Sequence, residues 1–144
     1  MKRILGLDWG EKRLGVALSD PLQITAGALG HLVRKNPDTD LEELARYINE
    51  HEVGEIVIGL PLHLDGGKGE SAEAACAFAQ SVRERFGLPV QLWDERMSTV
   101  AVEKMLISAD VSREKRRKVK DGLAAAYFLQ GFLDARQGER ESHD

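Results

Sequence analysis

Residues 4–20 read ILGLDWGEKRLGVALSD, and this stretch gives the strongest indication of the fold. An apolar run stops at Asp8, passes through a turn that contains Gly10, and resumes as a second apolar run that ends at Asp20. The first run is unbroken, as expected of a central strand covered on both faces, and the second alternates larger and smaller residues. Two strands joined by so short a turn predict an antiparallel pair. Asp8 could cap the turn, help to hold a nucleotide's phosphates through a metal, or bind a catalytic metal.

The rest of the chain extends the sheet and adds helices. Residues 24–33 predict a third strand, weakened by two glycines, which completes an antiparallel meander. The later predicted elements are a helix at 38–52 with Thr39 or Asp40 as its cap, a strand at 55–60, a helix at 71–86, a strand at 89–94, a helix opening at Ser98, and a last helix at 121–136. A meander followed by right-handed crossovers predicts an α/β fold with a five-stranded mixed sheet and helices on both faces.

Length and composition predict one cytoplasmic domain. The chain has 144 residues, which we divide into a single domain at 1–137 and a short polar tail at 138–144. Apolar residues make up 42% and charged residues 31%, as in ordinary soluble proteins. No apolar run approaches the roughly 20 residues that cross a bilayer, so no membrane partner is expected. Cys76 is the only cysteine, which excludes an internal disulfide and favours the cytoplasm.

Charge is unevenly distributed along the chain. The net charge is −4, but residues 113–120, REKRRKVK, hold six basic residues and one acid. One basic segment in an otherwise acidic protein is typical of an enzyme that binds a polyanion, such as a nucleic acid, at one local surface. The alternative is a solvated connection, which is the usual role of a charge run. The candidate phosphate contacts in this segment are Arg113, Arg116, Arg117, Lys118 and Lys120.

Acidic residues follow the predicted strands. Asp8 ends the first strand, the triplet DER at 94–96 ends the last one, and Asp121 opens the last helix. Ligand sites in open α/β sheets lie beyond the carboxyl ends of the strands, so these acids are expected to converge. Carboxylates suit Mg²⁺ or Mn²⁺, and two such ions can hydrolyse a phosphodiester. Asp94 and Glu95 point to opposite faces, so only one is expected to bind metal directly. Asp121 could instead be a plain N-cap.

Four motifs, GLDWGEKRLGVALSD, IVIGLPLHLDG, WDERMST and KDGLAAAYFLQGFLD, occur in this order over nearly the whole chain. Together they resemble the YqgF/RuvX family of Holliday junction resolvases and pre-16S rRNA nucleases, which have the RNase H-like fold. The resemblance implies antiparallel strands 1–2–3, parallel strands 1, 4 and 5, and an acidic site formed by Asp8, Glu95 and Asp121. Trp9 and His63 depart from the family pattern, where Tyr and Asn are more usual. Neither change removes an acid, and Trp9 is expected to be a core residue.

Residues and resemblance together predict a nuclease that hydrolyses phosphodiester bonds by a two-metal-ion mechanism with Mg²⁺ or Mn²⁺. The expected substrate is structured RNA, in the maturation of the 5′ end of precursor 16S rRNA, with branched DNA such as a Holliday junction second. The competing interpretation is a non-catalytic nucleic-acid-binding module of the same fold. Monomer and homodimer both fit the sequence. The predicted catalytic metal ligands are Asp8, Glu95 and Asp121, with Asp94 as a further ligand candidate. The predicted nucleic-acid contacts are Arg13, Lys68, Arg96 and the five basic residues named above.

Overall fold

The computed structural model describes residues 2–10, 12–60, 70–94 and 113–142. Its elements are β1 (Arg3–Asp8), β2 (Arg13–Ser19), β3 (Ala26–Val33), α1 (Pro37–Glu50), β4 (Val53–Leu60), α2 (Glu70–Phe86), β5 (Val90–Asp94) and α4 (Arg113–Ser142). The strands form one sheet in the order β3-β2-β1-β4-β5. Strand β2 pairs antiparallel with β1 and β3, whereas β4 pairs parallel with β1 and β5. The predicted mixed sheet is confirmed, while the helix predicted to open at Ser98 lies outside the described residues.

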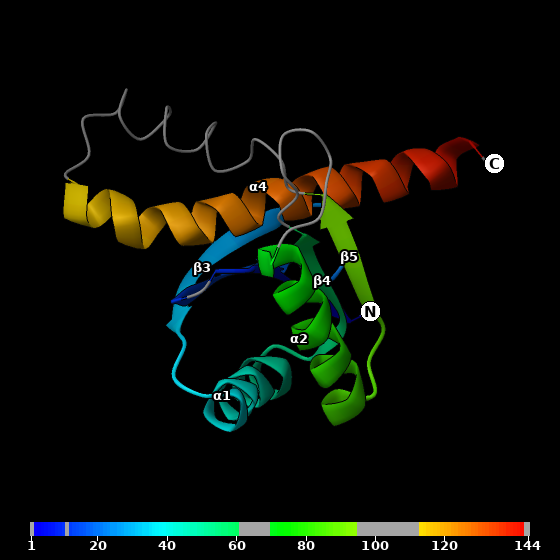
Figure 1. Ribbon diagram of the computed structural model, residues 1–144. Coiled ribbons are helices and arrows are strands. Elements are labelled where there is room, and N and C mark those ends of the chain that lie inside the picture. Colours follow the sequence, from blue (N-terminus) through cyan, green and yellow to red (C-terminus); the bar gives the residue numbers. More distant parts are fainter. Residues whose placement is uncertain (1, 11, 61–69, 95–112, 143–144) are drawn as a thin grey trace.

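Helices cover both faces of the sheet. Helix α4 crosses one face, and α1 and α2 pack on the other (Figure 1). Leu5 and Leu7 of β1 pack in the core under α1 and α2, whereas Ile4 packs against Phe128 and Leu129 of α4. Successive side chains of a strand alternate between faces. The even-numbered positions of β1, which end at Asp8, therefore belong to the face that α4 covers.

Helix α1 begins earlier than the sequence predicts. Asn36 is its N-cap, accepting a hydrogen bond from the Thr39 backbone N–H at 2.9 Å, and Pro37 opens the helix. The prediction of Thr39 or Asp40 as the cap is wrong, because an Asn followed by Pro satisfies the first turn better. Asp40 is 1% exposed instead, and its carboxylate accepts from the Lys35 backbone N–H at 2.9 Å.

Helix α4 begins at Arg113, eight positions before the predicted start at Asp121. The basic segment is therefore part of the helix, since Arg, Lys and Glu are good helix formers, and its interpretation as a connection is wrong. Asp121 lies inside the helix, so it is not an N-cap. Helix α4 also continues to Ser142, into the predicted polar tail. Although α4 has 30 residues, no helix in the described ranges is both long and apolar enough to cross a membrane.

Two glycines let α4 lie very close to the sheet. A Cβ added at Gly122 would lie 3.0 Å from the backbone N and O of Gly30 in β3, so helix and strand meet backbone to backbone. A Cβ added at Gly6 of β1 would lie 3.1 Å from Cβ and Cδ2 of Leu129. Leu129 is fully buried over this position. These contacts place the middle of α4 directly across β3 and β1.

Two polar side chains in the second half of α4, Gln130 and Arg136, bind the sheet. The Gln130 side chain accepts from the Ala26 N–H and donates to the Ile24 carbonyl, each at 2.9 Å, where β3 begins. Further along, Arg136 donates to both carboxylate oxygens of Glu55 in β4 at 2.7 Å. This paired geometry is the strong form of an Arg–carboxylate contact. The direction of α4 across the sheet is thus set at several points from β3 to β4.

Candidate functional site

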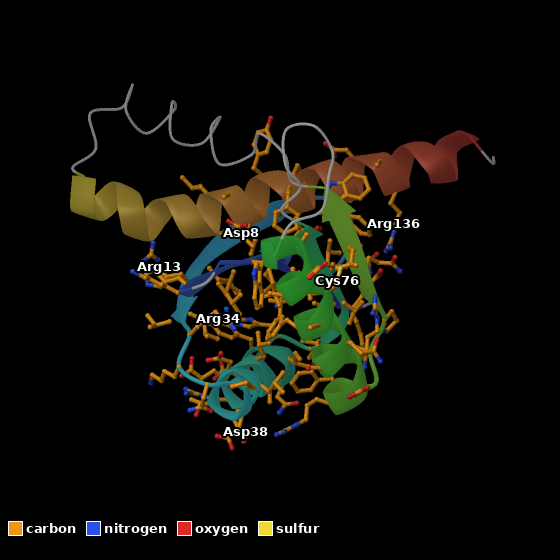
Figure 2. The ribbon with its side chains drawn as sticks, in the orientation of Figure 1. Asp8, Arg13, Arg34, Asp38, Cys76 and Arg136 are labelled. Atoms are coloured by element: carbon orange, nitrogen blue, oxygen red, sulfur yellow. The ribbon has the colours of Figure 1, made fainter. Side chains whose placement is uncertain are left out.

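Asp8 ends β1 at the carboxyl edge of the parallel strands, where α4 crosses the sheet (Figure 2). Its neighbours across the sheet are Gly15 of β2 and Gly59 of β4. The alternation of β1 assigns Asp8 to the α4 face, where neither glycine presents a side chain. The Asp8 carboxylate, which is half-buried, therefore has a glycine beside it on both adjacent strands. On this face the two positions beside Asp8 in the sheet therefore contribute backbone only.

Strand β5 brings the backbone of Asp94 to the same edge of the sheet. Trp93 pairs with Gly59 and therefore lies in the same row of the sheet as Asp8. Its ring packs edge-on against Phe132 of α4 at 5.4 Å between centroids, which places Trp93 on the α4 face. The next position, Asp94, is the last residue of β5 and pairs with Leu60 of β4. Glu95 and Arg96 lie outside the described residues.

Helix α4 carries Asp121 over the same face. Its neighbour Gly122 meets Gly30, which lies one residue row from the row of Asp8. Asp121 is four positions before the fully buried Ala125, so its position belongs to the sheet-facing side of the helix. The backbone positions of Asp8 and Asp121 thus share one face and one edge, separated by the width of about two strands.

Basic positions flank this face. Arg13 alternates with Leu14 of the α1 and α2 core, so it belongs to the α4 face, two residues along β2 from the partner of Asp8. Figure 2 shows Arg13 under the beginning of α4. The segment 113–120 forms the first turns of that helix. Lys68 lies outside the described residues.

A complete metal centre is not visible in the described ranges. Among the residues they contain, no three His, Cys, Asp or Glu side chains gather as candidate ligands. The described part supplies the Asp8 carboxylate and the backbone positions of Asp94 and Asp121. All these donors are hard oxygens, a set that fits Mg²⁺ or Mn²⁺ better than zinc.

Trp9 is a core residue, as predicted. It is 9% exposed and packs against Phe78 of α2 with ring centroids 5.0 Å apart. Its Nε1 is buried and meets no acceptor in the described part of the chain. Trp9 therefore anchors the residue that follows Asp8 in the core of α1 and α2.

His31 occupies a position in the same row and on the same face as Asp8, although nothing in the sequence indicated it. It pairs with Gly15, so His31, Gly15 and Asp8 form one row, and it alternates with the buried Leu32 to the α4 face. This register depends on a bulge in the β2–β3 pair beside Gly30, which has φ of 127°. A bulge of this kind has no clear signature in a single sequence, apart from the glycine itself.

The fold that carries these residues is that of the RNase H-like resolvases. RuvC from T. thermophilus, solved in complex with a Holliday junction substrate, is similar with a TM-score of 0.58 at 15% identity, over 96% of this chain and 97% of that one. The fowlpox virus resolvase, solved with Holliday junction DNA, has a TM-score of 0.52 at 12% identity, over 92% of this chain and 97% of that one.

The chain belongs to the RuvX family, because the family model described as "RuvX: Holliday junction resolvase" matches residues 2–135. A relative from Desulforamulus reducens is 51% identical over 133 residues, which cover 92% of this chain and 97% of the relative. One from Myxococcus xanthus is 49% identical over 133 residues, covering 92% and 88%. Both are named "Putative pre-16S rRNA nuclease". The resemblance in the sequence motifs is thus confirmed.

Proposed function

We propose that this protein is a divalent-metal-dependent nuclease that hydrolyses phosphodiester bonds at the carboxyl edge of its sheet, on the face that α4 covers. The observation that carries the proposal is the placement of Asp8, which lies between Gly15 and Gly59 on the face that also receives Asp121 from α4. Asp8, Glu95 and Asp121 hold the metal in this proposal. Family membership supports the reaction class.

The donor set supports Mg²⁺ or Mn²⁺. A pair of such ions would activate the attacking water and stabilise the leaving oxygen. Asp8 supplies a carboxylate, and the neighbouring positions on both adjacent strands are glycines, which add no competing side chain on this face. Trp93 lies on the same face as Asp8, and side chains alternate along a strand, so the proposal takes Glu95, two positions further on, as the direct ligand. Asp94 is the second candidate.

Structured RNA is the proposed substrate, in the maturation of the 5′ end of precursor 16S rRNA in the cytoplasm. The names of relatives about half identical to this chain support this choice. Branched DNA is the second candidate, because fold neighbours were solved with Holliday junctions. That candidate includes a homodimer, since the resolution of a four-way junction takes two cuts.

Matched substrates test the proposal directly. The full chain is mixed with precursor 16S rRNA, a DNA copy of the cleaved region, and a four-way DNA junction, each with Mg²⁺, Mn²⁺ or EDTA. We expect metal-dependent cleavage of the RNA and none in EDTA. Preferential cleavage of the junction would select the branched-DNA candidate. Binding of all three without cleavage would identify a non-catalytic module, and cleavage that persists in EDTA would contradict the metal mechanism.

Substrate binding is assigned to Arg13, Lys68, Arg96 and the basic segment of α4. Replacing Arg116, Arg117 and Lys118 with alanine is expected to weaken RNA binding and to flatten its salt dependence. Each phosphate contact contributes about 0.7 to the log–log salt slope on single strands, so three contacts account for about 2. Turnover at saturating substrate is expected to change less, because these side chains bind substrate and transition state alike.

The matched control for this variant removes basic residues on the far side of the sheet, Arg46 of α1 and Arg85 of α2. Affinity and salt slope are measured by titration of labelled RNA at several salt concentrations. A slope that stays at the wild-type value in the triple variant would remove the basic segment from the binding surface.

A further inference from the structure

Arg34, 24 residues along the chain from Gly10, contacts the turn that follows Asp8. Its Nη1 donates to the Gly10 carbonyl at 3.1 Å, and its guanidinium carbon lies 4.1 Å from the centre of the Trp9 ring. The Arg34 backbone N–H also donates to the Lys12 carbonyl at 2.9 Å. One residue therefore contacts both residues that follow Asp8 and the other side of the same turn.

The turn itself has little freedom. A Cβ added at Gly10 would overlap the Arg13 carbonyl oxygen, so the two backbone segments touch at this point. On the other side, Trp9 is packed against Phe78. Because Asp8 is the last residue of β1, the direction of its side chain depends on the path that the backbone takes into this turn.

Asp40 forms an ion pair with Arg34. Its Oδ2 lies 3.6 Å from Arg34 Nε, an ion pair in which the side chain of Asp40 is 2% exposed and that of Arg34 is 24% exposed. Its Oδ1 accepts from the Lys35 backbone N–H. Removing Arg34 would leave the buried Asp40 carboxylate without a cation, which is strongly destabilising. A planar guanidinium can pair with Asp40, lie on the Trp9 ring and donate to Gly10 at once, which the point charge of a lysine cannot do.

We infer that Arg34 is a positioning residue for metal binding: with Asp40, it holds the turn from the α1 side so that Asp8 is presented to the cation on the opposite, α4 face. Figure 2 shows Arg34 between α1 and the end of the sheet that carries Asp8. The inference rests on the proposed function, because it assigns the cation to Asp8. Arg34 acts through the Trp9–Gly10 backbone and touches neither metal nor substrate.

The chain offers a closely matched control in Arg136. This residue donates to both oxygens of Glu55 and lies 4.4 Å from the centre of the Phe132 ring, so it also combines a carboxylate with an aromatic ring. It lies at the other side of the molecule from the Asp8 turn (Figure 2). Arg34→Lys and Arg136→Lys keep the charge and lose the same kinds of contact, and both are expected to lower Tm.

Binding of Mn²⁺ separates the two variants. Free Mn²⁺ is followed by its electron paramagnetic resonance signal during titration of the full chain, at a temperature below every unfolding transition. Residues that orient metal ligands typically change metal affinity by about 10- to 100-fold. We expect Arg34→Lys to raise the Kd for Mn²⁺ about tenfold, at the lower end of that range. Arg136→Lys is expected to leave the Kd unchanged.

A second variant, Asp40→Asn, keeps the contact with the Lys35 N–H and is expected to raise the Kd by less than Arg34→Lys does. Wild-type Kd values in both Arg34→Lys and Asp40→Asn would overturn the inference alone. Equal Mn²⁺ binding by Asp8→Asn and the wild type would instead show that the proposed site at Asp8 is wrong, and the inference with it. Both outcomes are read from the same titrations.

Discussion

Replacing Asp8 with asparagine is expected to slow cleavage about 10³-fold, the effect of losing several kcal/mol of metal-dependent transition-state stabilisation. The amide keeps the size of the carboxylate but loses its charge, so it is a poor ligand for a hard cation. Binding of nucleic acid is expected to persist. Without metal, the Tm of Asp8→Asn is expected to equal or exceed that of the wild type. Carboxylates that gather to bind a metal repel one another when no metal is bound, and the substitution removes one of these charges.

Asp38 provides the matched control, since it is exposed in the first turn of α1, away from the α4 face (Figure 2). Asp38→Asn is expected to retain wild-type cleavage. Rates are measured under single-turnover conditions with saturating enzyme, and Tm by calorimetry with and without Mn²⁺. If Asp8→Asn unfolds the protein instead, Asp8 is a turn residue with a structural role, and the metal must be held elsewhere.

Truncating Leu129 to alanine is expected to cost about 3 kcal/mol of unfolding free energy, the middle of the range for a buried leucine. For a chain of this length that corresponds to a drop in Tm of about 10 °C. Leu129 is fully buried over Gly6, where helix and strand are in close contact. The converse change, Gly6→Ala, adds a methyl 3.1 Å from Leu129 Cδ2 and is expected to cost about 1 kcal/mol by overpacking.

The double variant tests whether this contact positions α4. With Leu129 shortened, the methyl added by Gly6→Ala no longer meets Cδ2 but still lies 3.1 Å from Cβ, which alanine keeps. The overpacking is thus relieved in part, and the combined loss should fall short of the sum by about 0.5 kcal/mol. Denaturant unfolding of the wild type, the two single variants and the double variant measures this coupling. Because α4 carries Asp121, Gly6→Ala is also expected to lower the cleavage rate at temperatures where it stays folded. Strict additivity would show that α4 is positioned by its other contacts.

Local pattern was enough to predict most of the fold. The alternation of residues 13–20 and the unbroken run before Asp8 predicted the β1–β2 pair, and the structure has it in the register Asp8 with Gly15. The position of Asp8 at the strand end followed from the same pattern. The start of α4 was missed because the basic run 113–120 was treated as a segment separate from the apolar helix after it, although its residues are strong helix formers. The cap of α1 was missed although Asn36 followed by Pro37 is itself a helix start signal.

By itself, the sequence determined the kind and order of the described elements and which acid ends which strand, since periodicity and turn chemistry act within a few residues. Only the packing of the helices on the sheet shows that Asp8 lies on the face that α4 covers. In β5, Trp93 is the residue that packs against Phe132 of α4, in the same row of the sheet as Asp8. The tertiary structure also decided that Arg34 reaches back to Gly10, a contact 24 residues apart in the chain. This contact arises only when β3 pairs with β2, which brings Arg34 beside the Asp8 turn, and no local pattern encodes it.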